Sequence, residues 1–222
     1  CPHPRTAAGS GGPRAVRQRK APGARHLGRA PGAEYDGLGM DALVLDGCRR
    51  EEGARALAAL GDALRAARYT TNAILLREKT LAPCRGCFGC WVKTAGECVI
   101  DDAGREVARA IARCDLLIYL TPVTFGGLSS ELKKALDRMI PNISPFFARV
   151  DGETHHQRRY RRPQRLVGLG ILPQPDPAAE RIFKTLVERN GLNLRTSRVA
   201  AAIATPASDL AATVTALLKA VE

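Results

Sequence analysis

The sequence predicts an α/β fold with a parallel sheet and helices on both of its faces. Short apolar runs alternate with segments of helical periodicity five times between Met40 and Glu222. A repeated strand–helix order favours parallel strands whose faces are both covered. The chain has 222 residues, of which 45% are hydrophobic and 25% charged, so it can bury a sizeable core as one domain.

The five strands are expected at apolar runs that read as buried segments. They are residues 41–47, 72–78, 115–120, 165–172 and 197–204.

Helices are expected between these runs. The first spans 51–68, where Ala and Leu recur at helical spacing. The second runs from Asp101 to Arg113, and Asp101 or Asp102 suits its N-cap.

Three further helices complete the pattern. Ser129 and Ser130 open an amphipathic helix that ends at Arg138. The next is expected over 177–190, closed by Gly191, and the last over 206–221. For the last helix, Thr205 is the expected N-cap and a proline occupies the first helical position, where it is tolerated.

Residues 1–39 are expected to be a disordered basic leader, and residues 40–222 the working domain. The leader has eight Gly, five Pro and no periodicity, so it cannot bury enough apolar surface to offset its ordering entropy. It also holds seven Arg and Lys against two acidic residues. The net charge of +12 raises the question of nucleic acid, but aromatics are only 5% and no stacking platform appears. Nucleic-acid binding is therefore not expected.

The sequence gives no sign of a membrane or secreted protein. No apolar run approaches the roughly 20 residues that span a bilayer, and the first residues lack the apolar core of a signal peptide. We therefore expect a cytoplasmic protein with reduced thiols.

Four of the seven cysteines lie close together in the segment from Pro83 to Asp102. Cys84, Cys87, Cys90 and Cys98 are separated by two, two and seven residues. Four thiolates with short spacings can hold a four-iron four-sulfur cluster or a Zn²⁺ ion. A metal-free loop that packs at a dimer contact is the alternative.

Two segments are expected at one crevice. In a parallel sheet that reverses direction, ligands bind at the carboxyl ends of the strands. The cysteine segment and TPVTFGG (121–127) each follow the end of an expected strand. The stretch from Ile140 to Pro163 is too long for an ordinary connection, so we expect residues 140–164 to form a lid or a dimer arm.

Four motifs together carry a family resemblance. They are DGCRREEGARAL after the first strand, PC-x2-C-x2-C before DD, TPVTFGG with LKKALDR downstream, and GETHHQRRY. From Met40 to Glu222 the chain resembles the flavodoxin-like NAD(P)H-dependent FMN oxidoreductases, whose branch with a compact cysteine motif includes the iron–sulfur flavoproteins. The resemblance implies a three-layer sandwich with strand order 2-1-3-4-5 and FMN at the switch point.

The resemblance also implies which loops hold FMN. The loop from Gly47 to Arg55 would receive the phosphate, that from Thr121 to Gly127 the isoalloxazine edge, and that from Leu172 to Gln174 the other side of the ring. The implied cofactor-binding residues are Gly47, Cys48, Arg50, Arg55, Thr121, Pro122, Val123, Thr124, Phe125, Gly126, Gly127, Leu172 and Pro173.

The phosphate loop departs from the G-S-P-R-x-x-G-N-T pattern of the family. Cys48, Ala54 and Arg55 replace its serine, asparagine and threonine. A backbone cradle survives such changes, and Arg50 or Arg55 can replace the lost hydroxyl bonds with charge-assisted ones. In the second loop, Thr124 replaces the common aromatic residue.

The implied function is that of an NAD(P)H-dependent FMN oxidoreductase. It would pass electrons to a small acceptor such as a quinone or a flavin, with or without a cluster, and act as a homodimer. No protein acid or base is predicted as catalytic. The alternative is a flavodoxin-like electron carrier or binding module without turnover. His155 and His156 with Arg158–Arg162 would grip an NAD(P)H phosphate or a substrate anion, or else form a solvated charge run.

Overall fold

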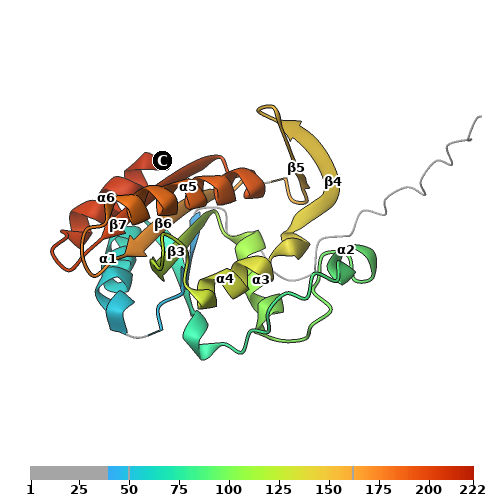
Figure 1. Ribbon diagram of the computed structural model, residues 1–222, viewed down its shortest axis with the longest axis horizontal. Coiled ribbons are helices and arrows are strands. Elements are labelled where there is room, and N and C mark those ends of the chain that lie inside the picture. Colours follow the sequence, from blue (N-terminus) through green and yellow to red (C-terminus); the bar gives the residue numbers. More distant parts are fainter. Residues whose placement is uncertain (1–39, 50, 162) are drawn as a thin grey trace, which may run out of the picture. The chain divides into compact units, whose positions relative to one another are not determined.

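The computed structural model describes residues 40–49, 51–161 and 163–222. Within this part, five parallel strands form one sheet in the order β2-β1-β3-β6-β7 (Figure 1). When only the strands of this sheet are numbered along the chain, the order is 2-1-3-4-5, and the predicted topology is confirmed. The strands are β1 (Met40–Asp46), β2 (Tyr69–Leu75), β3 (Leu116–Pro122), β6 (Arg165–Ile171) and β7 (Arg198–Ala204).

Helices cover both faces of the sheet, as predicted. Helices α1 (Ala54–Ala66) and α6 (Leu210–Ala220) pack on one face. Helices α3 (Ala103–Arg113), α4 (Ser130–Asp137) and α5 (Pro177–Leu194) pack on the other. The central strand β3 contributes to the core on each face. Leu117 and Tyr119 pack under α3, α4 and α5, Ile118 packs under α1 and α6, and all three are 0% exposed.

Strand β2 begins at Tyr69, three residues before the predicted start. Its residues 70–73 are exposed, because β2 is an edge strand that pairs only with β1 among the described strands. A prediction based on apolar runs therefore missed the first half of β2. The end of the predicted strand instead forms a short 3-10 helix, η2 (Leu76–Glu78).

Two predicted helix ends are wrong. Helix α5 continues past Gly191 to Leu194, since Gly191 is buried inside the helix and its Cα faces Val199 too closely for a side chain. Thr205 does not cap α6. Its N–H donates to Ser208 Oγ in a turn, and Asp209 accepts the cap hydrogen bond from Ala212 N–H.

The long segment after α4 is ordered as an antiparallel hairpin of β4 (Ile143–Val150) and β5 (Glu153–Arg158), preceded by η3 (Ile140–Asn142). The hairpin stands apart from the sheet (Figure 1). It is fastened to α5, because Glu153 pairs with Arg189 at 2.6 Å and His155 Nδ1 lies 3.1 Å from Asn193 Oδ1. Among the described residues, no helix is both long and apolar enough to cross a membrane.

Candidate functional site

The loops after β1 and β3 are joined by direct hydrogen bonds. Gly47 N–H donates to Leu120 O at 2.8 Å, and Ser129 Oγ donates to Gly47 O at 2.7 Å. Ser129 N–H in turn donates to Thr121 Oγ1 at 2.9 Å. A Cβ on Gly47 would lie only 2.6 Å from Ser129 Oγ, so this contact requires glycine. The predicted phosphate loop and ring loop therefore lie side by side at the carboxyl edge of the sheet.

Cys48 faces the core rather than the crevice. Its side chain is 0% exposed and packs where Gly53 has no Cβ. Its N–H donates to Asp46 Oδ1 at 2.9 Å. Burial, with the nearby Asp46 carboxylate, raises the pKa of the Cys48 thiol well above its usual range. The thiol is thus a packing group, and a phosphate contact from its side chain is not available.

Asp46 is a site residue that the sequence reasoning missed. It is 2% exposed and pairs with Arg77 at 2.8 Å, which ties the end of β1 to the turn after β2. The available signal was an acidic residue directly before the loop glycine. Its buried carboxylate occupies the base of the predicted phosphate loop, so a second anion there must be balanced by cations.

The described cations near this loop are Arg49 and Arg55. Arg49 is bound to Ser130 Oγ and Glu131, the latter at 3.2 Å, at the start of α4. Arg55 lies exposed in the first turn of α1, which has no side-chain N-cap hydrogen bond. Arg50 lies outside the described residues. A 3-10 turn, η1 (Glu51–Gly53), leads directly into α1, so main-chain donors for a phosphate would come from this turn rather than from α1 itself.

The loop after β3 makes a tight turn. Thr124 N–H donates to Gly127 O at 3.1 Å, and Gly127 N–H donates back at 2.8 Å. Phe125 (φ 51°) and Gly126 (φ 76°) form its tip, and Phe125 is 99% exposed. Within the described chain, the N–H groups of these two tip residues donate to no partner. The N–H of the exposed Phe125 is therefore open to a ligand edge, whereas Gly126 is buried against Ile182.

The third predicted loop adjoins the second. Val123 N–H donates to Ile171 O at 2.9 Å, and Leu172 N–H donates to Ala204 O at 2.9 Å. The Leu172 side chain is buried, whereas Pro173 is exposed. The three loops thus meet at one edge. The main chain of η1 and the two arginines suit a flavin phosphate, and the tip of the loop after β3 suits the edge of the flavin ring.

The four cysteines of the segment line one cavity of about 330 Å³. Cys84 and Cys87 are exposed, Cys98 is half-buried, and Cys90 is buried. Burial, with the neighbouring Cys98, raises the pKa of the Cys90 thiol. Among the described residues, no three His, Cys, Asp or Glu side chains converge as ligands of a single metal ion. All four thiols border one cavity, and a four-iron four-sulfur cluster uses four thiolate ligands.

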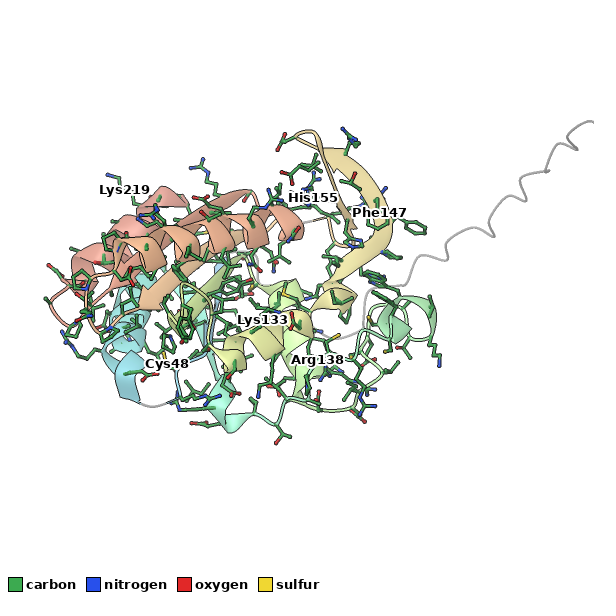
Figure 2. The ribbon with its side chains drawn as sticks, viewed as in Figure 1. Cys48, Lys133, Arg138, Phe147, His155 and Lys219 are labelled. Carbon is green, nitrogen blue, oxygen red and sulfur yellow. The ribbon has the colours of Figure 1, made fainter. Side chains whose placement is uncertain are left out.

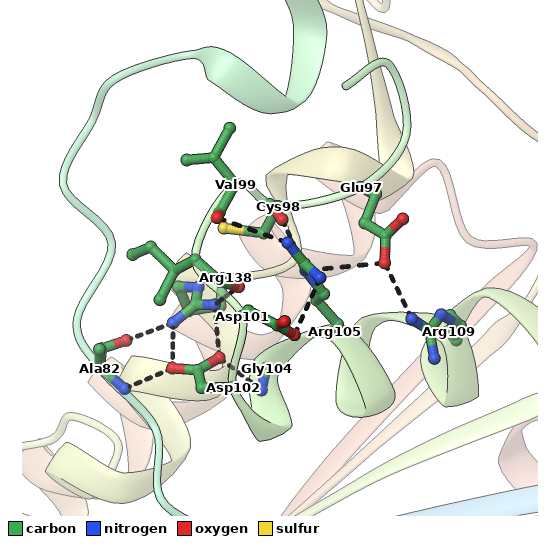
Figure 3. A network of polar contacts seen from close by, with 11 residues as sticks. Ala82, Glu97, Cys98, Val99, Asp101, Asp102, Gly104, Arg105, Arg109 and Arg138 are labelled. Atoms are coloured by element: carbon green, nitrogen blue, oxygen red, sulfur yellow. Dashed lines mark hydrogen bonds and ion pairs between the residues drawn. The ribbon is translucent and has the colours of Figure 1, made fainter. Parts of the chain in front are cut away.

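An ion pair between Arg138 and Asp102 holds the two ends of the cysteine segment together (Figure 3). Arg138, 1% exposed at the end of α4, contacts Asp102 Oδ1 at 2.6 Å and Oδ2 at 2.8 Å. It also donates to Ala82 O at 2.7 Å and Ile100 O at 3.3 Å, on either side of the cysteines. The Arg138 hydrogen bonds hold the pKa of Asp102 at about 2. Asp102 also caps α3 through Gly104 N–H, as predicted for a helix start.

Aromatic rings join the cysteine segment to the hairpin. Phe88 stacks on Trp91 at 5.2 Å, Trp91 lies 5.1 Å from the His156 ring, and His156 lies 4.6 Å from Phe147. Trp91 Nε1 also donates to Ile143 O at 3.1 Å. Figure 2 shows Phe147 and His155 on the hairpin, away from Cys48. His155 is buried with partners on both ring nitrogens, and His156 is half-buried with Nδ1 2.7 Å from Ser144 O. The anion grip by His155 and His156 stays a prediction.

The fold and the three crevice loops define a flavodoxin-like α/β protein. Residues 40–153, just over half of the chain, match the family described as NADPH-dependent FMN reductase. The chain belongs to this family.

Individual relatives agree with this family. An iron–sulfur flavoprotein of Methanocaldococcus jannaschii is 41% identical over 71 residues, which is 32% of this chain and 36% of the relative. The chain thus matches about a third of that relative's length. An NAD(P)H:quinone oxidoreductase from Methanothermobacter marburgensis has a TM-score of 0.57 at 17% identity, covering 82% of this chain and 94% of the other. An FMN-dependent NADH-azoreductase from Bacillus anthracis, solved with FMN, has a TM-score of 0.52 at 11% identity, covering 83% and 100%. These two structures show the shared fold.

Proposed function

We propose that this protein is an NAD(P)H-dependent oxidoreductase that binds FMN and passes electrons to a small acceptor such as a quinone or a flavin. The observation that carries the proposal is the hydrogen-bonded junction of Gly47, Leu120 and Ser129, which fixes two crevice loops against each other. FMN, when bound, accepts a hydride and returns electrons, and the protein supplies binding and orientation.

Different crevice residues would bind the phosphate and the ring of FMN. Main-chain N–H groups of η1, with Arg49 and Arg55, would hold the phosphate. The free N–H group of Phe125 would face the pyrimidine edge of the ring. The exposed Pro173 would line the other side. No side chain is assigned as a proton donor or acceptor.

A spectrum tests the proposal directly. The protein is incubated with FMN, desalted and scanned, and flavin absorbance bands are expected to stay with the protein. Oxidation of NADPH and NADH with benzoquinone as acceptor then measures turnover. Absence of bound flavin would reject the proposal. Bound flavin without turnover would favour the electron-carrier alternative.

We propose a four-iron four-sulfur cluster as the ligand of the cysteine cavity. Its four lining thiols and the apolar side chains of Phe88, Ile100 and Ile140 support this assignment. Iron, zinc and flavin analysis of one anaerobic preparation is the test, with about four irons per chain expected. Cys84→Ser should lose the iron, whereas Cys114→Ser, in the buried core, should keep it. Stoichiometric zinc would instead support a structural metal site.

We also propose that the protein is a cytoplasmic homodimer in which residues 140–164 act as a dimer arm or lid. Phe146 and Phe147 of β4 support the dimer arm, because they are 69% and 61% exposed. Free cysteines throughout the described residues support a reducing compartment. Light scattering tests the dimer, and Phe146→Ser with Phe147→Ser should yield monomers. A wild-type protein that is monomeric at micromolar concentration would reject the arm.

A further inference from the structure

A second cavity, of about 360 Å³, lies between helix α3, the end of the cysteine segment and the end of the hairpin. Arg105, Arg109 and Arg113 of α3 line it. They lie four residues apart and so share one face of the helix. Glu97 and Cys98 form the wall opposite, and Cys98 also borders the cysteine cavity. The two cavities therefore share a cysteine.

The arginines on this face are not all neutralised. Arg105 Nε donates to Cys98 O at 2.8 Å and its guanidinium pairs with Asp101 at 2.8 Å (Figure 3). Arg109 pairs with Glu97 at 2.8 Å. Arg113 is exposed and has no hydrogen bond or ion pair within the part of the chain that the structure describes. Glu97 is the one carboxylate among the described residues that line the cavity.

A fourth arginine reaches the same place from the hairpin. A Cβ on Gly96 would lie 3.9 Å from Arg159 NH1, so this guanidinium lies at the rim of the cavity. Its Nε is buried and finds no hydrogen-bond partner among the described atoms. Arg159 lines an adjoining cavity, which shares Tyr160 and Asn142 with this one. A donor that its protein surroundings do not satisfy therefore lies directly beside the cavity.

We propose that this cavity binds a small polyanion carrying at least two carboxylate or phosphate groups. Guanidinium groups match both oxyanions in charge and in bidentate geometry. The volume is within the range of small-molecule sites. Arg113 and Arg159 supply the unbalanced charge, and Asn142 and Tyr160 add neutral donors. The bound anion lies beside Cys98, on the outer side of the cysteine segment, and its binding requires neither flavin nor metal.

Calorimetric titration of the full chain tests the site with two probes, citrate for carboxylates and pyrophosphate for phosphates. Arg113→Gln with Arg159→Gln should weaken binding about tenfold or more, because two charge-assisted contacts are lost. Glu97→Gln should strengthen it several-fold, since it removes the competing carboxylate from Arg109. Opposite effects distinguish a binding site from a folding defect.

The matched control is Arg65→Gln with Lys219→Gln. It removes the same net charge from exposed positions on α1 and α6, and it should leave the affinity unchanged. The tighter-binding probe identifies the anion chemistry. The proposal is overturned if neither probe binds the wild type, if the control weakens binding as much as the double variant, or if Glu97→Gln weakens it.

Discussion

The flavin crevice and the cysteine segment are held in place in different ways. In the crevice, main-chain groups of Gly47, Leu120 and Ser129 join the loops after β1 and β3, with the hydroxyls of Ser129 and Thr121 completing two of the three bonds. In the cysteine segment, one buried side-chain pair, Arg138 and Asp102, ties together Ala82 and Ile100. The first region thus depends on main-chain groups together with two neutral hydroxyls, and the second on a charged pair of side chains.

This difference explains how the phosphate loop departs from its family. Cys48, Ala54 and Arg55 replace three polar residues, yet the loop still contacts β3 and α4 through its main chain. Side-chain identity is therefore less restricted there than in the cysteine segment. Four predictions follow the comparison, beginning with the segment that depends on side chains.

Arg138→Met should have the largest effect. It removes the charged partner of the half-buried Asp102 carboxylate, which keeps only the N–H groups of Ala82 and Gly104, and this costs about 3 kcal/mol of unfolding free energy, the lower end for a buried pair. Urea denaturation followed by circular dichroism measures the change. The control is Lys133→Met on the same helix, which breaks only an exposed pair with Asp137 and should cost less than about 1 kcal/mol. Equal losses of stability in the two variants would contradict the structural role of the Arg138–Asp102 pair.

Gly47→Ala should come second. A Cβ there lies 2.6 Å from Ser129 Oγ and 2.7 Å from Leu132 Cβ, so the loops must separate at a cost of about 1–3 kcal/mol. We expect a lower melting temperature and loss of FMN on desalting. Gly61→Ala in α1 is the control, because nothing lies within 4 Å of the new Cβ and the change should stabilise the helix. A Gly47→Ala protein with wild-type stability would show that the junction is not tight.

Stability should fall in acid through Asp102. Its pKa is about 2 in the folded protein, against 3.8 ordinarily, so its contribution is present above about pH 4 and is lost as the pH falls through 2. The difference is about 2 kcal/mol, at about 1.4 kcal/mol per pKa unit. Denaturation of wild type and Asp102→Asn at several pH values measures it. The stability gap between the two should narrow in acid, and a constant gap would contradict the assignment.

Asp46→Asn should have the smallest effect, in the crevice. Removing a buried carboxylate next to the phosphate loop should tighten FMN binding by on the order of 1 kcal/mol, while riboflavin, which has no phosphate, should be little affected. Fluorescence titration with both flavins gives the ratio of affinities. If neither flavin binds, the proposed function fails. If both bind and the ratio does not change, only the role of Asp46 fails.

Much of the fold could be predicted because its strands are continuous apolar runs. The order 2-1-3-4-5 came from the family resemblance, and the start of β2 was missed because an edge strand carries exposed residues such as Thr70 and Asn72. The partners of charged side chains could not be predicted. Arg138 meets Asp102 across 36 positions, and Asp46 meets Arg77 across 31. Such pairs depend on how helices and turns pack, and no local pattern marks them.

The stack of rings around Trp91 also gives the protein an intrinsic fluorescent probe. Trp91 is the only tryptophan in the chain, and its indole lies against His156 of the hairpin and Phe88 of the cysteine segment. Any rearrangement of either neighbour changes the polarity and quenching that the indole experiences. Its fluorescence emission therefore reports structural changes at the contact between the hairpin and the cysteine segment, without an added dye.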